Sequence, residues 1–189
     1  MLCEIYPLTK SGFDIPTVDF SDDSTIRFYE KWEKLRALQI NNAVTLLFER
    51  NRENISHCAS RLFYFASICK ENMDDFYITH GDAGGNFFVS DGHNYIIDWD
   101  EVMYSPIERD AWVMCCYDWA RELFNNTLMK NHIQYQLRPE RLAFYCYHMF
   151  FHYLCEFAED STLHDNSKRI EDYFDNGWIE QRIKFADTI

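Results

Sequence analysis

The apolar positions of this chain recur mainly at the spacing of an α-helix. Within residues 24–38, Phe28, Trp32 and Leu35 stand three or four positions apart and so share one face. Asp22 precedes this run and supplies an oxygen-bearing side chain typical of a helix N-cap. The same periodicity predicts further helices at about 41–51, 54–71, 108–124, 138–160 and 165–186. The chain is therefore predicted to be mostly helical.

The period changes between residues 76 and 98. Three short β-type runs are predicted as strands, at 76–79, 87–90 and 95–98. Asp91-Gly92 is a hairpin-turn signal between the last two. Four of the six glycines lie between residues 81 and 92, beside the densest polar cluster of the chain. These features predict a mostly α (α+β) fold with one small hairpin and one tightly turned loop.

The chain of 189 residues suits one compact domain, which would bury about 70% of the surface its unfolded chain exposes. Residues 1–22 lack a period and are interrupted by prolines and a glycine, so this segment is predicted to be irregular. Residues 23–189 form the predicted helical domain, with the loop and hairpin at 76–100. No apolar run approaches the roughly 20 residues of a membrane helix, and no basic leader with an apolar core indicates a signal peptide.

The net charge of −13 excludes nucleic acid as a favoured partner, because an acidic surface repels phosphate backbones. The same charge either attracts Mg²⁺ and amine-bearing substrates or simply keeps the protein soluble. The seven cysteines are odd in number and include no Cys-x-x-Cys pair, which argues against a disulfide framework or a zinc knuckle. We therefore expect a cytoplasmic protein.

The polar cluster carries the groups that phosphoryl transfer needs. That reaction uses a carboxylate to accept the proton of the attacking hydroxyl, and hard oxygen ligands for Mg²⁺. Asp82 lies in the glycine-rich loop, Asn86 at the mouth of the hairpin, and Asp98 at the end of the last predicted strand. A tight hairpin would bring Asn86 and Asp98 together. One carboxylate and one amide are a suitable pair of protein ligands, with nucleotide phosphates and water completing the octahedron.

The motif residues between Ile78 and Asp110 resemble those of aminoglycoside phosphotransferases and choline kinases, small-molecule relatives of protein kinases. They are His80-Gly81-Asp82, Asn86, Ile97-Asp98-Trp99-Asp100, Pro106 and Asp110. The resemblance implies the helical C-terminal lobe of a kinase-like fold, with ATP or GTP and Mg²⁺ as cofactors. It implies that Asp82 is the catalytic base, that Asn86 and Asp98 bind Mg²⁺, and that Asp110 anchors the next helix. His80 is expected to support the loop.

The chain departs from the family pattern in two ways. Three residues separate Asp82 from Asn86, whereas the kinase loop has four. We expect Gly84 and Gly85 to let the shorter loop reach the same point. The 77 residues before Ile78 carry no glycine-rich nucleotide loop and no lysine strand, so the first residues are interpreted as a remnant of the hinge between lobes. The isolated chain is then expected to be inactive, and its exposed lobe interface to favour self-association.

Substrate-binding candidates are carboxylates near or after the motif. Asp100 and Glu101 either bind a cationic substrate or a second metal, or are solvated. Asp118 and Glu122 share a predicted helix face, and later carboxylates such as Glu156 are further candidates, with solvated surfaces as the alternative. The aromatic stretch 144–157 and its histidines are expected to be core or partly buried.

The leading hypothesis is an ATP-dependent phosphotransferase acting on a hydroxyl of a small, cationic molecule, aminoglycoside-like or an amino alcohol, with antibiotic resistance as a possible context. The alternative is a non-catalytic remnant of the substrate lobe that binds a small molecule. A third hypothesis is a metal-dependent hydrolase that uses Asp82, Asp98 and Asp100. It differs from the first two in predicting activity without nucleotide.

Overall fold

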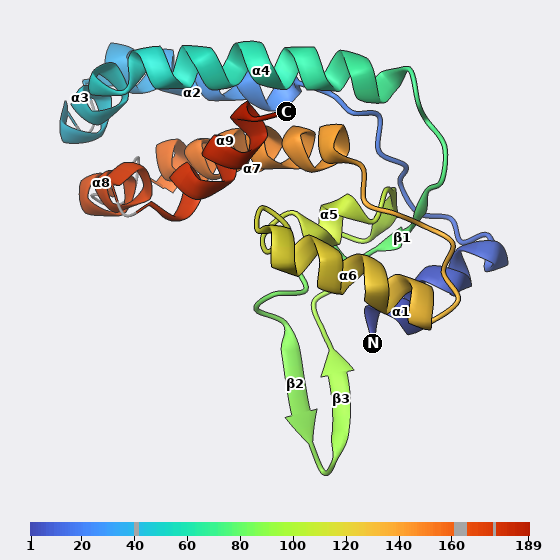
Figure 1. Ribbon diagram of the computed structural model, residues 1–189. Coiled ribbons are helices and arrows are strands. Elements are labelled where there is room, and N and C mark those ends of the chain that lie inside the picture. Colours follow the sequence, from blue (N-terminus) through green and yellow to red (C-terminus); the bar gives the residue numbers. More distant parts are fainter. Residues whose placement is uncertain (40–41, 161–165, 176) are drawn as a thin grey trace.

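The central element of the fold is the long helix α7, Pro139–Asp160 (Figure 1). The computed structural model describes residues 1–39, 42–160, 166–175 and 177–189. α7 carries aliphatic and aromatic residues on several sides, so it must be covered by other helices. α2 (Asp23–Leu38), α4 (Arg52–Lys70) and α9 (Trp178–Asp187) pack against it. Phe144, Phe150 and Phe151 are fully or almost fully buried there. The predicted core role of this aromatic stretch is confirmed.

The mostly helical class is confirmed as well. The remaining helices are α1 (Leu2–Ile5), the 3₁₀ helix η1 (Tyr6–Ser11), α3 (Asn42–Arg50), α5 (Glu108–Ala111), α6 (Asp118–Lys130) and α8 (Ser167–Asp175). Residues 2–11 are thus helical, although the sequence pattern predicted an irregular segment. Residues 41, 165 and 176 of the predicted helices lie outside the described residues. No helix in the described part of the chain is long and apolar enough to cross a membrane.

Two predicted helices are each divided in two. The prediction of one helix over 108–124 was wrong, because residues 112–117 form turns between α5 and α6. Arg121 explains part of this break: its Nη1 donates to the carbonyls of Cys115 and Cys116 at 3.0 and 3.4 Å, which satisfies groups that a helix would have bonded internally. The predicted helix 165–186 is divided into α8 and α9, and Gly177 adopts a left-handed φ of 73° at the start of α9.

A two-stranded sheet leads directly into the glycine-rich loop. β1 (Tyr77–Thr79) pairs antiparallel with β4 (Met103–Ser105), with Ile78 opposite Tyr104. The segment after η1 extends this sheet, because Val18 N donates to Tyr104 O and Tyr104 N donates to Pro16 O at 2.8 and 2.7 Å. β4 was not predicted, since its three residues are a strand only through these partners.

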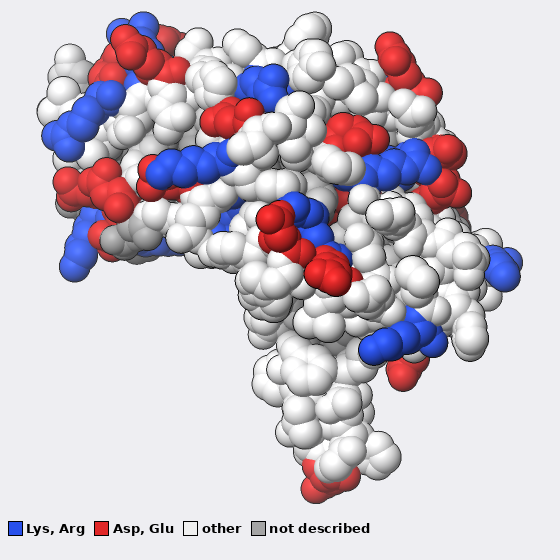
Figure 2. All heavy atoms as spheres, in the orientation of Figure 1, with Lys and Arg blue, Asp and Glu red and all other residues white. Residues whose placement is uncertain are grey.

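The second sheet is a hairpin that projects from the body of the protein (Figure 1). β2 (Phe87–Ser90) pairs antiparallel with β3 (His93–Ile96). Asp91 and Gly92 have φ of 49° and 74°, as a two-residue turn with two left-handed positions requires. The hairpin and its turn are confirmed, although the second strand begins and ends two residues earlier than predicted. In Figure 2 the hairpin is uncharged except at its tip, where Asp91 lies.

Candidate active site

The glycine-rich loop is held to the core by one carboxylate, that of Asp110 in α5. Its Oδ1 accepts the Gly81 N–H at 2.7 Å, and its Oδ2 accepts the His80 N–H at 3.3 Å and the Tyr6 hydroxyl at 3.1 Å. Burial raises the pKa of Asp110, while these donors act in the opposite direction. Asp110 therefore anchors the loop backbone itself, whereas the N–H groups of its own helix were the partners expected from sequence.

Gly81 is required at its position for two reasons. Its φ is +90°, a conformation that L side chains rarely adopt. A Cβ there would also overlap the guanidinium group of Arg109. This guanidinium donates to Thr79 Oγ1 and Glu101 Oε2 at 3.3 and 3.4 Å, so it lies directly behind the loop. The loop path is therefore fixed at Gly81 by sterics and by the Asp110 hydrogen bond together.

His80 links the loop to the strand that precedes Asp98. The side chain is fully buried. Its Nδ1 accepts the Asp82 N–H at 3.2 Å and so carries no proton, which leaves the proton on Nε2 to donate to the Ile97 carbonyl at 2.8 Å. The Trp99 ring packs edge-on against the imidazole, with ring centroids 4.5 Å apart. One neutral tautomer thereby holds the backbone on both sides of the site.

Asp82 and Asn86 are in direct contact despite the short loop between them. Asn86 Nδ2 donates to the Asp82 carbonyl at 2.8 Å and to Asp82 Oδ2 at 3.1 Å. Neither Gly84 nor Gly85 has a left-handed φ, and a Cβ on either would meet nothing within 4 Å. The shorter loop thus reaches Asn86 without using the conformational freedom of these glycines, so the reason that the sequence suggested for them was wrong.

Asn86 and Asp98 are brought together by the base of the hairpin. Phe87 pairs with Ile96, and Ile97 N donates to Asn86 O at 3.1 Å. Asp98 follows at once, in a left-handed conformation with φ of 64°. A non-glycine residue in that region costs about 1 kcal/mol or more and is often found at functional sites. The Asp98 carboxylate is exposed and bonds to no residue in the described ranges.

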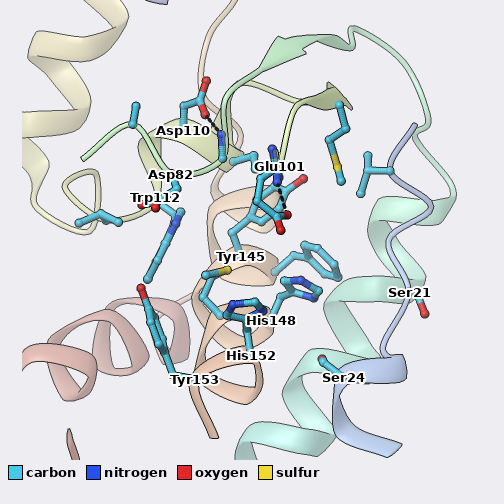
Figure 3. A pocket seen from close by; sticks show the side chains of 18 of the residues that line it. Ser21, Ser24, Asp82, Glu101, Asp110, Trp112, Tyr145, His148, His152 and Tyr153 are labelled. Carbon is cyan, nitrogen blue, oxygen red and sulfur yellow. Dashed lines mark hydrogen bonds and ion pairs between the residues drawn. The ribbon is translucent and has the colours of Figure 1, made fainter. Parts of the chain in front are cut away.

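Asp82 and Asp98 line a groove of about 1520 Å³ between the loop, α2 and α7. Asp82, Asp98, Asp100 and Glu101 lie on the loop and hairpin side of this groove. Figure 3 shows Asp82 and Trp112 facing Tyr153 of α7 across the groove, with His148 and His152 on the same helix. A single groove therefore contains the expected base, one expected metal ligand and a wall of aromatic and imidazole side chains.

The substrate-binding candidates divide between groove and surface. Asp100 and Glu101 line the groove, and Glu101 Oε2 is paired with Arg109. Asp118 and Glu122 are exposed on α6 and are not among the residues that line the groove, and Asp118 forms a surface ion pair with Arg121. Glu156 does line it, and its Oε1 lies 3.1 Å from His152 Nε2.

Sequence reasoning missed the residues that meet the motif only through the fold. Tyr6 holds Asp110 across 104 positions of the chain, and Arg109 lies behind Gly81. Trp112 and Tyr153 face Asp82 from other elements. The only sequence signal for Arg109 was its place beside Asp110. Tyr6 and Tyr153 had none, because both belong to segments that were predicted as irregular or as core.

Behind α5, a buried network fixes the helix that carries Asp110. Glu108 accepts the Tyr135 hydroxyl and the Arg138 N–H, both at 2.6 Å. Arg141 donates to Tyr135 and, through Nη2, to the Asn72 and Asp74 carbonyls. Burial raises the pKa of Glu108 to about 6, against the lowering effect of its hydrogen bonds. α5 is thus joined to the start of α7 and to the segment between α4 and β1.

The donors present suit one hard cation held by few protein ligands. Within the described residues, no group of three or more His, Cys, Asp or Glu side chains could hold a metal ion. Asn86 Nδ2 is used as a donor to Asp82, so its amide oxygen is the atom left for a ligand. That oxygen and the Asp98 carboxylate match a Mg²⁺ site completed by phosphate and water.

Comparisons with known proteins concern the family and the fold of the chain. A family model described as a phosphotransferase enzyme family matches residues 13–145. The chain is similar to spectinomycin phosphotransferase in complex with ADP and spectinomycin, with a TM-score of 0.66, 15% identity, and coverage of 98% of this chain and 61% of that one. The AMP-bound complex of that enzyme has a TM-score of 0.68 and 16% identity, with coverage of 96% of this chain and 62% of that one. No curated protein matches the chain. At these identities the likeness shows the fold, and the chain spans about three fifths of the length of those structures.

Proposed function

The chain belongs to the phosphotransferase enzyme family, and on that basis we propose that it carries the acceptor and metal side of an ATP-dependent phosphotransferase. The acceptor is a hydroxyl of a small, cationic molecule. The observation that carries this proposal is the contact of Asp82 with Asn86 at the base of the hairpin, with Asp82 and Asp98 lining one groove of a kinase-like fold. Spectinomycin, bound by a structural relative, is a hydroxylated amine and makes an aminocyclitol the first acceptor class to test.

In this proposal each polar group of the site has a defined task. Asp82 orients the acceptor hydroxyl and accepts its proton, and its exposed carboxylate is within the groove to do so. Asn86 holds the Asp82 carboxylate by Nδ2, which keeps the base in one rotamer. The Asn86 amide oxygen and Asp98 would hold Mg²⁺, which when bound neutralises phosphate charge. Asp110 and His80 keep the loop in register with Asp98.

Nucleotide binding by the chain tests the metal side of this proposal. We expect ADP to bind with Mg²⁺ and to bind at least tenfold more weakly without it, as measured by calorimetry. Asp98→Asn should remove the Mg²⁺ dependence, since Asn keeps the left-handed backbone preference and loses the charge. Asp91→Asn is the matched control, because Asp91 is also exposed, with φ of 49°, but lies at the hairpin tip. Equal binding by wild type and Asp98→Asn would refute the assignment.

A second candidate function is an acceptor-binding module without catalysis. Nucleotide affinity separates it from the first function, because within this sequence no glycine-rich nucleotide loop and no lysine strand precede the motif. This reading predicts that the chain binds an amine-bearing acceptor but shows no affinity for nucleotide with or without Mg²⁺. The same calorimeter decides between the two functions.

The exposed hairpin supports the expectation of self-association. Phe87, Phe88 and Val89 are 50%, 52% and 67% exposed, and β2 and β3 carry no charge along their length. Uncharged apolar strands with free edges favour pairing with another chain. Size-exclusion chromatography over a range of concentrations tests this, and a monomer at every concentration would contradict it. We further propose a cytoplasmic location, on the cysteine content alone.

A further inference from the structure

One face of α7 forms the wall of the groove opposite the catalytic loop. His148, His152, Tyr153 and Glu156 all line the groove from this helix, at spacings that place them on one side. Tyr153 is the residue of this face that Figure 3 shows directed toward the part of the groove where Asp82 and Trp112 lie. The electrostatic influence of Asp82 on the Tyr153 phenol agrees with this placement.

The ring of Tyr153 is fixed by an aromatic cluster behind it. Trp178 packs edge-on against it with centroids 5.7 Å apart, Tyr173 lies at 6.0 Å, and Phe157 stacks at 6.5 Å. Tyr173 and Phe157 are buried, so the cluster is a packed part of the core. A side chain with two rotatable bonds held in this way loses little further entropy when its hydroxyl binds a ligand.

The hydroxyl of Tyr153 is free to take such a partner. It forms no hydrogen bond with any residue in the described ranges, whereas the hydroxyls of four buried tyrosines donate to a carboxylate or a carbonyl: Tyr6, Tyr135, Tyr147 and Tyr173. Burial and the nearby charges of Asp82 and Glu156 raise the pKa of Tyr153. The phenol is therefore protonated at neutral pH and can donate as well as accept.

We propose that Tyr153 is a substrate-positioning residue, whose hydroxyl binds a hydroxyl or amine of the acceptor and holds the molecule against Asp82. This inference rests on the proposed function, and it names the face of the groove that selects the acceptor. A group held between a fixed phenol and the base has its oxygen oriented before phosphoryl transfer, which is the main contribution a protein makes to that reaction. Tyr153 acts on the acceptor alone and takes no part in nucleotide or metal binding.

The test compares Tyr153→Phe with wild type in two separate titrations. Kanamycin serves as the acceptor probe and ADP with Mg²⁺ as the nucleotide probe, both by calorimetry on the full chain. Loss of one hydrogen bond should weaken kanamycin binding about fivefold to tenfold and leave nucleotide binding unchanged. Tyr29→Phe is the matched control, because Tyr29 also packs against aromatic rings and has no hydroxyl partner in the described ranges, but lies outside the groove lining.

The outcomes separate this inference from the proposed function. If wild type and Tyr153→Phe bind kanamycin equally, or if wild type does not bind it, the inference is overturned whatever the nucleotide result. If only the nucleotide titration fails, the phosphotransferase proposal falls and the acceptor site stands. A purely structural role would lower the urea midpoint of Tyr153→Phe and weaken both ligands together, which would also overturn the inference. An unchanged midpoint with weaker kanamycin binding supports it.

Discussion

Replacement of Asp110 should loosen the glycine-rich loop more than any other single change at the site. The carboxylate accepts two backbone N–H groups of the loop and the Tyr6 hydroxyl. Hydrogen bonds to a charged group contribute about 1.5–3 kcal/mol each, and burial of the charge offsets part of that sum. The raised pKa of Asp110 has burial as its first cause, in line with this offset. We therefore expect Asp110→Ala to lower the free energy of unfolding by about 2–4 kcal/mol.

Two further variants divide this effect among its parts. Tyr6→Phe removes one of the three donors and should cost about 1 kcal/mol. Asp110→Asn keeps one acceptor oxygen but turns an amide N–H group toward the remaining donors, so its cost should lie between the other two. Asp118→Ala is the control, because its carboxylate is 95% exposed and surface ion pairs contribute less than about 1 kcal/mol.

Urea denaturation at neutral pH measures the order of these costs, and hydrogen exchange locates them. The amides of His80 and Gly81 should be protected in wild type and should exchange faster in Asp110→Ala. Protection that persists at both amides in Asp110→Ala would refute the anchoring role. So would a stability loss in Asp110→Ala that is no larger than that of Tyr6→Phe.

Three other predictions follow from local geometry. The folded pKa of Glu108 is about 6, above its ordinary value of 4.5, so its contribution to stability is present below pH 4.5 and is lost as the pH rises through 6. The difference in unfolding free energy between wild type and Glu108→Gln should therefore change by about 2 kcal/mol between pH 4.5 and 7.5 in urea titrations. A constant difference would contradict this. Gly84→Ala should be neutral or stabilise by up to about 1 kcal/mol, whereas Gly81→Ala should destabilise by about 1–3 kcal/mol, and equal midpoints would contradict the difference in backbone conformation. Burial raises the pKa of four thiols, those of Cys58, Cys69, Cys115 and Cys146. These thiols should therefore react with a disulfide reagent only after addition of urea. Rapid labelling of all seven cysteines in the native protein would contradict the burial of these four.

The helices were predictable because each buries one stripe of side chains, and apolar residues at helical spacing reveal that stripe in the sequence. Phe28, Trp32 and Leu35 are all buried, as their period predicted. The break at 112–117 was not predictable in the same way. Arg121 takes the carbonyls that would have continued the helix, and its reach depends on where α6 packs. The helical pattern carries no signal for such a competitor.

The candidates on α6 lie outside the groove for a different reason. Asp118 and Glu122 were selected because they share one helix face, and both do lie in α6. Their spacing says nothing about which neighbour that face meets, and both are exposed away from the residues that line the groove. Residues within the motif were predictable because a hairpin fixes their separation. Tyr6 and Tyr153 were not, because they approach the loop through tertiary packing alone.

The short loop gives a physical reason for an amide at position 86. Asn86 donates through Nδ2 to the Asp82 carbonyl and carboxylate, while its Oδ1 stays available. A carboxylate at this position could be a metal ligand but could not donate, and it would repel Asp82. An amide, unlike a carboxylate, can donate to Asp82 and still offer an oxygen to a cation. Asn86 therefore joins Asp82 to the hairpin as directly as Asp110 joins the loop to the core.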